Sequence, residues 1–149
     1  MSLQQEVMTK MKEAMKSKDQ VALTALRAVK SAILLAQTES GAGGELTEEQ
    51  ELKILQKQVK QRKDSAAIFV EQGRQDLASP ELAEAEVISQ FLPEALSEEE
   101  VEKVVVAIIE QVGAESMKDM GRVMGLASKQ LAGQADGKTI STIVRSKLA

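Results

Sequence analysis

The sequence predicts an all-α protein with an N-terminal four-helix module, residues 1–92, and a C-terminal three-helix bundle, residues 93–149. Apolar residues recur at three- and four-residue steps along nearly the whole chain. No segment alternates with the period of two that marks a half-buried strand, and the β-branched run at 104–106 lies inside a capped helical segment. Residues that start or stop helices bound each periodic segment.

The first three helices each begin at a residue that suits an N-cap. These residues are Ser2 with Gln5, Asp19, and Thr47 with Gln50. The segment 40–44 is rich in glycine, which predicts a flexible linker between the second and third helices. The third helix is expected to run towards Gly73, a suitable C-terminal stop.

The fourth helix is expected to begin at Ser79 and Pro80, because proline suits the first helical position. It is expected to end near Leu92, since Pro93 disfavours helical geometry in the residue before it. The boundary between the two modules is therefore placed at residues 92–96.

The C-terminal module has three start signals of the same kind. They are Ser97 with Glu100, Ser116 with Asp119, and Asp136. Gly113 and Gly133 are the expected stops of the first two of these helices. Met117 is assigned to the core side of the helix after Ser116, together with Met120 and Val123.

Composition excludes several classes of function. The 149 residues include no His, Cys, Trp or Tyr, and two Phe. This removes His- or Cys-ligated zinc and Ser-His-Asp or Cys-His nucleophiles, so no catalytic residue, metal or cofactor is expected. It also disfavours RNA modules that stack bases on aromatic side chains. No uninterrupted apolar run approaches the ~18 residues of a membrane span, and a cytoplasmic protein is expected.

Charge is unevenly distributed, although the whole chain carries only −4. Residues 93–116 hold one basic side chain against seven acidic ones. Residues 117–149 hold six basic side chains against two acidic ones. A local anion-binding surface is therefore compatible with an acidic total.

The most informative stripe lies on the helix after Ser116. Lys118, Arg122, Gly125 and Lys129 fall on one side of it, at about 100° per residue. Glycine inside a helix costs about 1 kcal/mol relative to alanine, so Gly125 needs a reason. One interpretation is a solvated face on which glycine is tolerated for helix crossing. The other is a face that a phosphate backbone approaches closely.

Lys138 and Arg145 share a face of the last helix, which supports the second interpretation. A glycine and a lysine also stand at its N-terminus, where free N–H groups favour anions. The segment 133–139 superficially resembles a Walker phosphate loop. It has three residues between its glycines instead of four and no predicted strand before it, so it is not expected to bind a nucleotide.

Arg62 is unusual because it lies on the apolar side of its helix, with Leu55 and Val59. An arginine there must pair with a carboxylate or expose its head group in a groove. A structural ion pair is the preferred interpretation.

Several motifs together resemble the YqeY family, small stand-alone relatives of the tail of the B subunit of the tRNA-dependent amidotransferase. They are KQRKDSA at 60–66, GRQDLA at 73–78, FLPE at 91–94, KDMGRVMG at 118–125 and ADGK at 135–138. The resemblance extends in order through essentially the whole chain. It implies a four-helix module joined to a three-helix module, in agreement with the pattern above.

The resemblance also implies contact with tRNA or a tRNA-bound enzyme, which gives the basic residues of 118–145 a role. The chain lacks the catalytic body of the amidotransferase, so activity by the protein alone is not expected. Two alternatives remain. One is a protein–protein adaptor whose acidic helix, 98–112, docks a basic partner. The other is a non-catalytic component of a glutamine-dependent amidotransferase.

Overall fold

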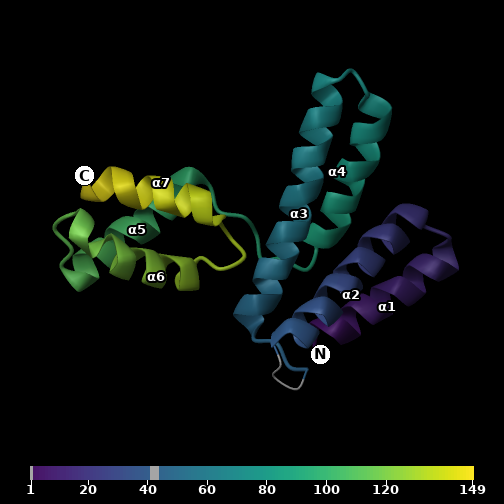
Figure 1. Ribbon diagram of the computed structural model, residues 1–149, viewed down its shortest axis with the longest axis horizontal. Helices are drawn as coiled ribbons and strands as arrows, with labels where there is room; N and C mark the ends of the chain where they lie inside the picture. The colour runs from purple at the N-terminus through teal and green to yellow at the C-terminus, as the bar shows by residue number, and fades with distance from the viewer. Residues whose placement is uncertain (1, 41–43) are drawn as a thin grey trace. The chain divides into compact units, whose positions relative to one another are not determined.

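The computed structural model describes residues 2–40 and 44–149 and is all-α over them, as predicted (Figure 1). No strand occurs in these two ranges. The helices are α1 (Leu3–Ser17), α2 (Gln20–Ser40), α3 (Glu48–Glu71), α4 (Gln75–Ser89), α5 (Glu98–Val112), the short 3-10 turn η1 (Met117–Asp119), α6 (Met120–Gln130) and α7 (Gly137–Leu148).

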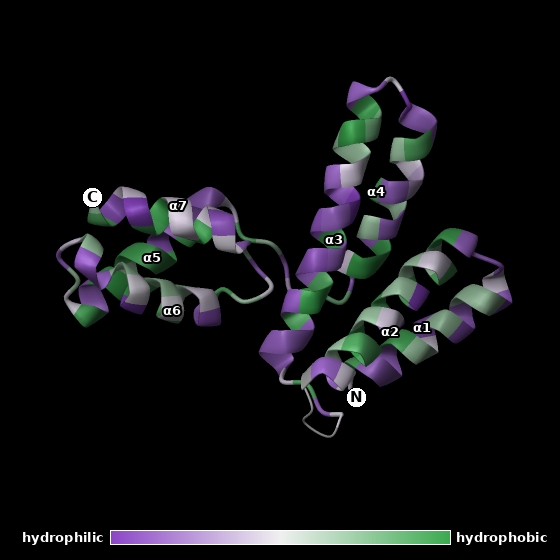
Figure 2. Ribbon diagram, in the orientation of Figure 1, coloured by the Kyte–Doolittle hydropathy of each residue, from purple (hydrophilic) through white to green (hydrophobic). Residues whose placement is uncertain are grey.

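The chain divides into two compact units, residues 1–92 (the first unit) and 93–149 (the second unit). Each unit has its own hydrophobic core. The first core includes Val7, Leu26, Val29, Leu55 and Ile88, and the second includes Val101, Val105, Val123, Ile140 and Val144. Figure 2 shows hydrophobic and hydrophilic residues on every helix, as expected for helices that bury one side only.

In the first unit α1 lies beside α2, and α3 lies beside α4 (Figure 1). The predicted start signals of α1, α2 and α3 are confirmed. Ser2 and Thr47 form complete capping boxes with Gln5 and Gln50, and the Asp19 carboxylate accepts a hydrogen bond from the N–H of Ala22. Of the predicted linker at 40–44, residues 41–43 lie outside the described residues.

The predicted start of the fourth helix is wrong. The structure begins α4 at Gln75, and Pro80 lies inside it. Pro80 has no N–H, so one hydrogen bond of the ladder is missing. The extra first turn buries Ala78 completely, and the side chain of Arg74 pairs with Asp76 beside it. Packing of this turn against the core therefore outweighs the positional preference of proline.

Arg62 forms the structural ion pair that its position predicted. Its Nε lies 3.5 Å from Oε1 of Glu84 on α4, and both side chains are largely buried. Its Nη1 donates hydrogen bonds to the side-chain and backbone oxygens of Gln58. The pair thus joins α3 and α4, which pack against each other in the first unit.

Helix α2 is long and apolar enough to cross a membrane by length and composition alone, over residues 20–39. The same helix supplies Leu23, Leu26, Val29 and Ile33 to the first core. A helix in a hydrophobic core can be as apolar as a membrane span, because both bury apolar side chains. Packing accounts for part of this hydropathy, since 33% of the segment is buried, while Val21, Leu34 and Leu35 on the same helix are exposed.

In the second unit, Ser97 and Glu100 form the predicted capping box of α5, and Gly113 ends the helix in the left-handed conformation. The N–H of Leu96 donates to the carbonyl of Gln134, which ties the start of this unit to the α6–α7 connection. Leu96 packs against the second core. The Asp136 carboxylate caps α7 by accepting from the N–H of Thr139, as expected.

The helix expected to follow Ser116 is divided. Ser116 and Asp119 form the predicted capping box, but they open η1, and α6 begins only at Met120. Met117 is 42% exposed, so its assignment to the core side is wrong. The tighter winding of a 3-10 turn displaces Met117 from the side that α6 buries.

Candidate nucleic-acid interface

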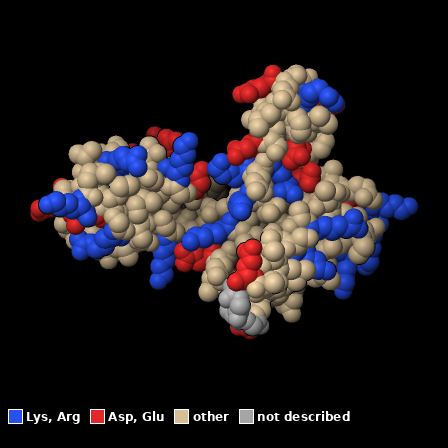
Figure 3. Space-filling model, in the orientation of Figure 1, with Lys and Arg blue, Asp and Glu red and all other residues tan. Residues whose placement is uncertain are grey.

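The six residues predicted to face a nucleic acid all lie on the surface of the second unit. Lys118 belongs to η1, Arg122, Gly125 and Lys129 to α6, and Lys138 and Arg145 to α7. In the orientation of Figure 1, α6 and α7 lie in front of α5, and Figure 3 shows lysine and arginine side chains over this side of the unit. We call these six residues, which lie on the outer sides of η1, α6 and α7, the basic face.

The core fixes the direction in which α6 presents its polar residues. Val123 and Ala127, one turn apart, are completely buried. Residues at 122, 125 and 129 follow the opposite side of the helix and are exposed. Three of the four residues of the predicted stripe therefore share this side of α6, whereas Lys118 lies in η1.

Gly125 packs against no other part of residues 2–40 and 44–149. A Cβ built at this position would meet no atom within 4 Å. The same is true of Gly121, one turn earlier and also exposed, which the sequence reasoning did not single out. Gly121 could have been found from the sequence, because it lies four residues, about one helical turn, before Gly125. Together the two glycines leave a strip of α6 without side chains, where another backbone can come close.

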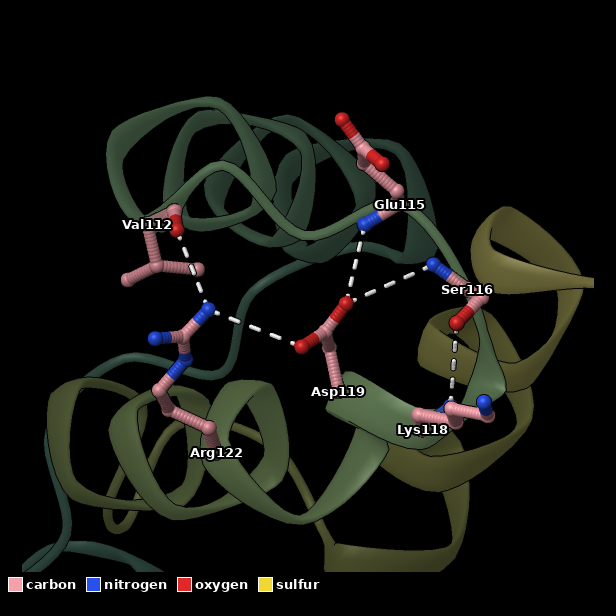
Figure 4. A network of polar contacts seen from close by, with 6 residues as sticks. All are labelled: Val112, Glu115, Ser116, Lys118, Asp119 and Arg122. Atoms are coloured by element: carbon pink, nitrogen blue, oxygen red, sulfur yellow. Dashed lines mark hydrogen bonds and ion pairs between the residues drawn. The ribbon is translucent and has the colours of Figure 1, made fainter.

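Arg122 differs from the other cations of the basic face because it is engaged within the unit. Its Nη2 donates a hydrogen bond of 3.1 Å to the backbone carbonyl of Val112, the last residue of α5 (Figure 4). The same nitrogen lies 3.6 Å from Oδ1 of Asp119. A cation at a helix C-terminus satisfies an unpaired carbonyl and complements the helix dipole. Arg122 therefore has a structural role as well as an exposed surface of 56%.

Asp119 holds this corner together (Figure 4). Its Oδ2 accepts hydrogen bonds from the backbone N–H groups of Glu115 and Ser116. These bonds, that of Glu115 above all, and the nearby charge of Arg122 lower the pKa of the Asp119 carboxyl below its ordinary value of 3.8. The carboxylate is thus anionic, and it offsets part of the charge of Arg122.

The other four cations have no such partner. In the part of the chain that the structure describes, no ion pair or side-chain hydrogen bond engages Lys118, Lys129, Lys138 or Arg145. Lys147, on the same helix as Arg145, is instead paired with Glu102 on α5 at 2.6 Å. Four of the five cations of the basic face are therefore available to an external anion.

The segment that resembles a phosphate loop has an acidic group where a phosphate would lie. The carboxylate of Asp136 accepts the N–H of Thr139 at 2.7 Å and so occupies the N-terminus of α7. That the segment does not bind a nucleotide stays a prediction. Over residues 2–40 and 44–149 there is also no group of three acidic side chains placed to hold a metal ion.

The basic face is therefore an exposed, positively charged surface of the second unit. Neither Phe of the chain lies in the second unit, so this unit has no aromatic side chain on which a base could stack.

Comparison with known proteins identifies relatives over most of the chain. The model of the Yqey-like protein family matches residues 4–148. A 73-residue stretch, 46% of the chain, is 41% identical to one subunit of the Glutamyl-tRNA(Gln) amidotransferase of Thermococcus gammatolerans, of which it covers 12%. The chain is also similar to Altered inheritance of mitochondria protein 41 of two fungi.

For Clavispora lusitaniae the identity is 41% over 62% of the chain and 55% of the relative. For Pyrenophora tritici-repentis it is 30% over 84% of the chain and 68% of the relative. The chain thus spans about an eighth of the amidotransferase subunit and just over half of the first fungal relative. Because the family model covers nearly every residue, this chain belongs to the YqeY-like protein family and is related to a subunit of the tRNA-dependent amidotransferase.

Proposed function

We propose that this protein is an accessory RNA-binding protein that holds tRNA, or a tRNA-bound enzyme, on its basic face. The observation that carries the proposal is the set of four exposed cations, Lys118, Lys129, Lys138 and Arg145, without partners among the described residues. Cations that are already solvated and unpaired bind phosphates without first breaking an internal contact.

Two further features favour a nucleic-acid backbone. The open strip at Gly121 and Gly125 permits a sugar–phosphate chain to approach the α6 backbone. The lack of aromatic residues in this unit makes recognition by shape and charge the expected mode, with little sequence preference. Transfer RNA is the preferred RNA because one relative is named as part of a glutamyl-tRNA amidotransferase.

The test is the salt dependence of binding to purified tRNA, measured by fluorescence anisotropy. If the five cations of the basic face each neutralise one phosphate, the log–log slope of affinity against salt is at most about −4 to −5. Replacing Lys118 and Lys138 with glutamate is expected to weaken binding at least tenfold and to flatten the slope by about two.

The matched control reverses two exposed lysines of the first unit, Lys16→Glu and Lys30→Glu, which alters net charge equally. This control variant is expected to bind tRNA nearly as well as the natural protein. If tRNA binds no better than heparin, or if both double variants weaken binding alike, the basic face is only a solvated surface.

A second function follows from the relationship to the amidotransferase. In this second function the chain serves as a non-catalytic component of an amidotransferase, or as an adaptor that binds a basic partner through the acidic helix α5. A pull-down from cell extract, with and without ribonuclease, separates these functions from RNA binding. A protein partner that survives ribonuclease favours the component or the adaptor, whereas a partner lost with the RNA favours the proposal.

A further inference from the structure

The outer side of α5 carries charge of the opposite sign to the basic face. Within 93–116, Lys103 is the single basic residue. Glu99, Lys103 and Glu110 follow the exposed side of the helix, opposite the buried Val101, Val105 and Ile108. We call this outer side, together with Val106 and Ala107, the acidic face.

The acidic face is hollowed along its middle. Val106 and Ala107 form the floor because their side chains are short, and Glu99, Glu102, Lys103 and Glu110 stand around them. Among the described residues, no ion pair engages Glu99, Lys103 or Glu110. Only Glu102 is committed, to Lys147.

We infer that the acidic face of one copy binds the α6 side of the basic face of a second copy. Both surfaces belong to the same unit, both are exposed, and their charges are opposite. The proposal does not depend on RNA binding, since it concerns the protein alone.

The spacing of charges on the two surfaces is nearly the same. Glu99 and Glu110 are eleven residues apart on α5, about 16 Å at 1.5 Å per residue. Lys118 and Lys129 are also eleven residues apart, about 17 Å when η1 rises ~2 Å per residue. An antiparallel arrangement of the two helices therefore places Lys118 near Glu110 and Lys129 near Glu99 at the same time.

This register also brings the two open glycines of α6 opposite Lys103 and Ala107 of the acidic face. Lys103, the one cation of the acidic face, lies opposite Gly125, where no side chain is in the way. Ala107 lies opposite Gly121, so the two backbones can approach closely. The open strip of α6, where an added Cβ meets no atom of the described residues, thus has a function in this contact.

The parallel arrangement is less favourable. It would place Arg122 opposite Lys103, two like charges that repel each other. The antiparallel register places Arg122 opposite Val106, and Arg122 keeps its hydrogen bond to Val112. The contact joins two different surfaces, so each pair of copies leaves one surface of each kind unused, and assembly can continue beyond two copies.

Sedimentation velocity of the full chain without RNA tests the inference. At roughly 10 mM salt the weight-average mass is expected to rise with concentration above the 16.1 kDa of one chain, and at roughly 0.3 M salt to return to it. Since no RNA is present, failure of the proposed RNA binding does not alter the result.

Two charge reversals make the test specific. Glu99→Lys with Glu110→Lys, and Lys118→Glu with Lys129→Glu, are each expected to abolish self-association. Mixing the two variants in equal amounts is expected to restore association, because each then meets a face of opposite charge. Circular dichroism verifies that both variants are folded, as expected for substitutions at exposed positions.

Two controls separate this contact from a general effect of charge. Glu71→Lys with Glu86→Lys, exposed positions of the first unit, leaves association unchanged. Gly125→Leu alters no charge but blocks the space for Lys103, and is expected to reduce association at least tenfold. A natural chain that stays monomeric at every concentration at low salt overturns the inference, as does a mixture that fails to associate.

Discussion

Arg62 in the first unit and Arg122 in the second show two ways of using one side chain. The side chain of Arg62 is 13% exposed and lies in the interface between α3 and α4, against Glu84. The side chain of Arg122 is 56% exposed and holds the carbonyl of Val112 from the surface. In the first unit a cation joins two helices from within, whereas in the second unit it closes one helix end and remains in contact with solvent.

The difference in burial sets the energetic consequence of each contact. When one partner of a buried ion pair is removed, the protein loses stability, because the remaining charge stays in an apolar setting. A solvated cation that loses its partner is compensated by water. The first unit thus uses charge to align helices, and the second leaves most of its charge available to other molecules.

The largest expected effect is that of Arg62→Ala. Removing the guanidinium leaves Glu84, 14% exposed, without its partner, and is expected to lower the free energy of unfolding by about 2–3 kcal/mol. Urea denaturation followed by circular dichroism measures it. The double substitution Arg62→Met with Glu84→Leu is expected to recover most of the loss, since neither charge then remains. Equal losses in the single and double variants would contradict the role of the ion pair.

A pair of glycine substitutions compares two sites in the second unit. Gly125→Ala is expected to raise stability by about 0.5–1 kcal/mol, because the site is open and alanine is the better helix former. Gly113→Ala is expected to lower stability by about 1 kcal/mol, since Gly113 has φ +68°. Calorimetry of both variants is the measurement. A destabilising Gly125→Ala would show that α6 needs this glycine for its own fold.

Arg122→Ala and Lys129→Ala compare an engaged cation with an unpaired one on the same helix. Arg122→Ala loses the hydrogen bond to Val112, and is expected to lower the free energy of unfolding by about 0.5 kcal/mol. Lys129→Ala is expected to leave it unchanged within measurement, while both weaken tRNA binding. Thermal denaturation and anisotropy together separate the two roles. A more destabilising Lys129→Ala would refute the assignment.

The smallest effects come from two carboxyls whose pKa values shift in opposite directions. Burial, and then the charges of Glu48 and Glu6, raise the pKa of Glu51 above 4.5. The protonated form is favoured by folding, so this stabilisation is complete below the unfolded-state pKa and is lost as pH rises through the folded-state pKa. Glu51→Gln is therefore expected to be more stable than the natural chain at neutral pH, with the difference vanishing in acid.

Asp119 provides the opposite case, because its pKa is lowered below 3.8. Its stabilisation is present above the unfolded-state pKa and is lost as pH falls through the folded-state pKa. Asp119→Asn is expected to be less stable than the natural chain at neutral pH, and to approach it in acid. The melting temperatures of Glu51→Gln and Asp119→Asn, each compared with that of the natural chain from neutral to acidic pH, test both predictions. If the two variants differ from the natural chain in the same direction at neutral pH, the predictions are contradicted.

Local signals in the sequence were sufficient for the fold class and for most helix starts. The boxes at Ser2, Thr47 and Ser97 were predictable because each joins residues three apart. The start of α4 was not, because the burial of Ala78 depends on contacts with the rest of the core. For the same reason the exposure of Met117 could not be inferred from helical periodicity alone.

The candidate site was predictable to the same extent. Periodicity placed Arg122, Gly125 and Lys129 on one side of a helix, since that depends only on the rotation per residue. Which cations stay unpaired depends on neighbours that are distant in the chain, such as Val112 for Arg122 and Glu102 for Lys147. The sequence by itself determined the helices, their caps and their charged sides, because these interactions act within one turn. Only the tertiary structure decided which charges are consumed inside the protein, because those pairs form when separate helices pack.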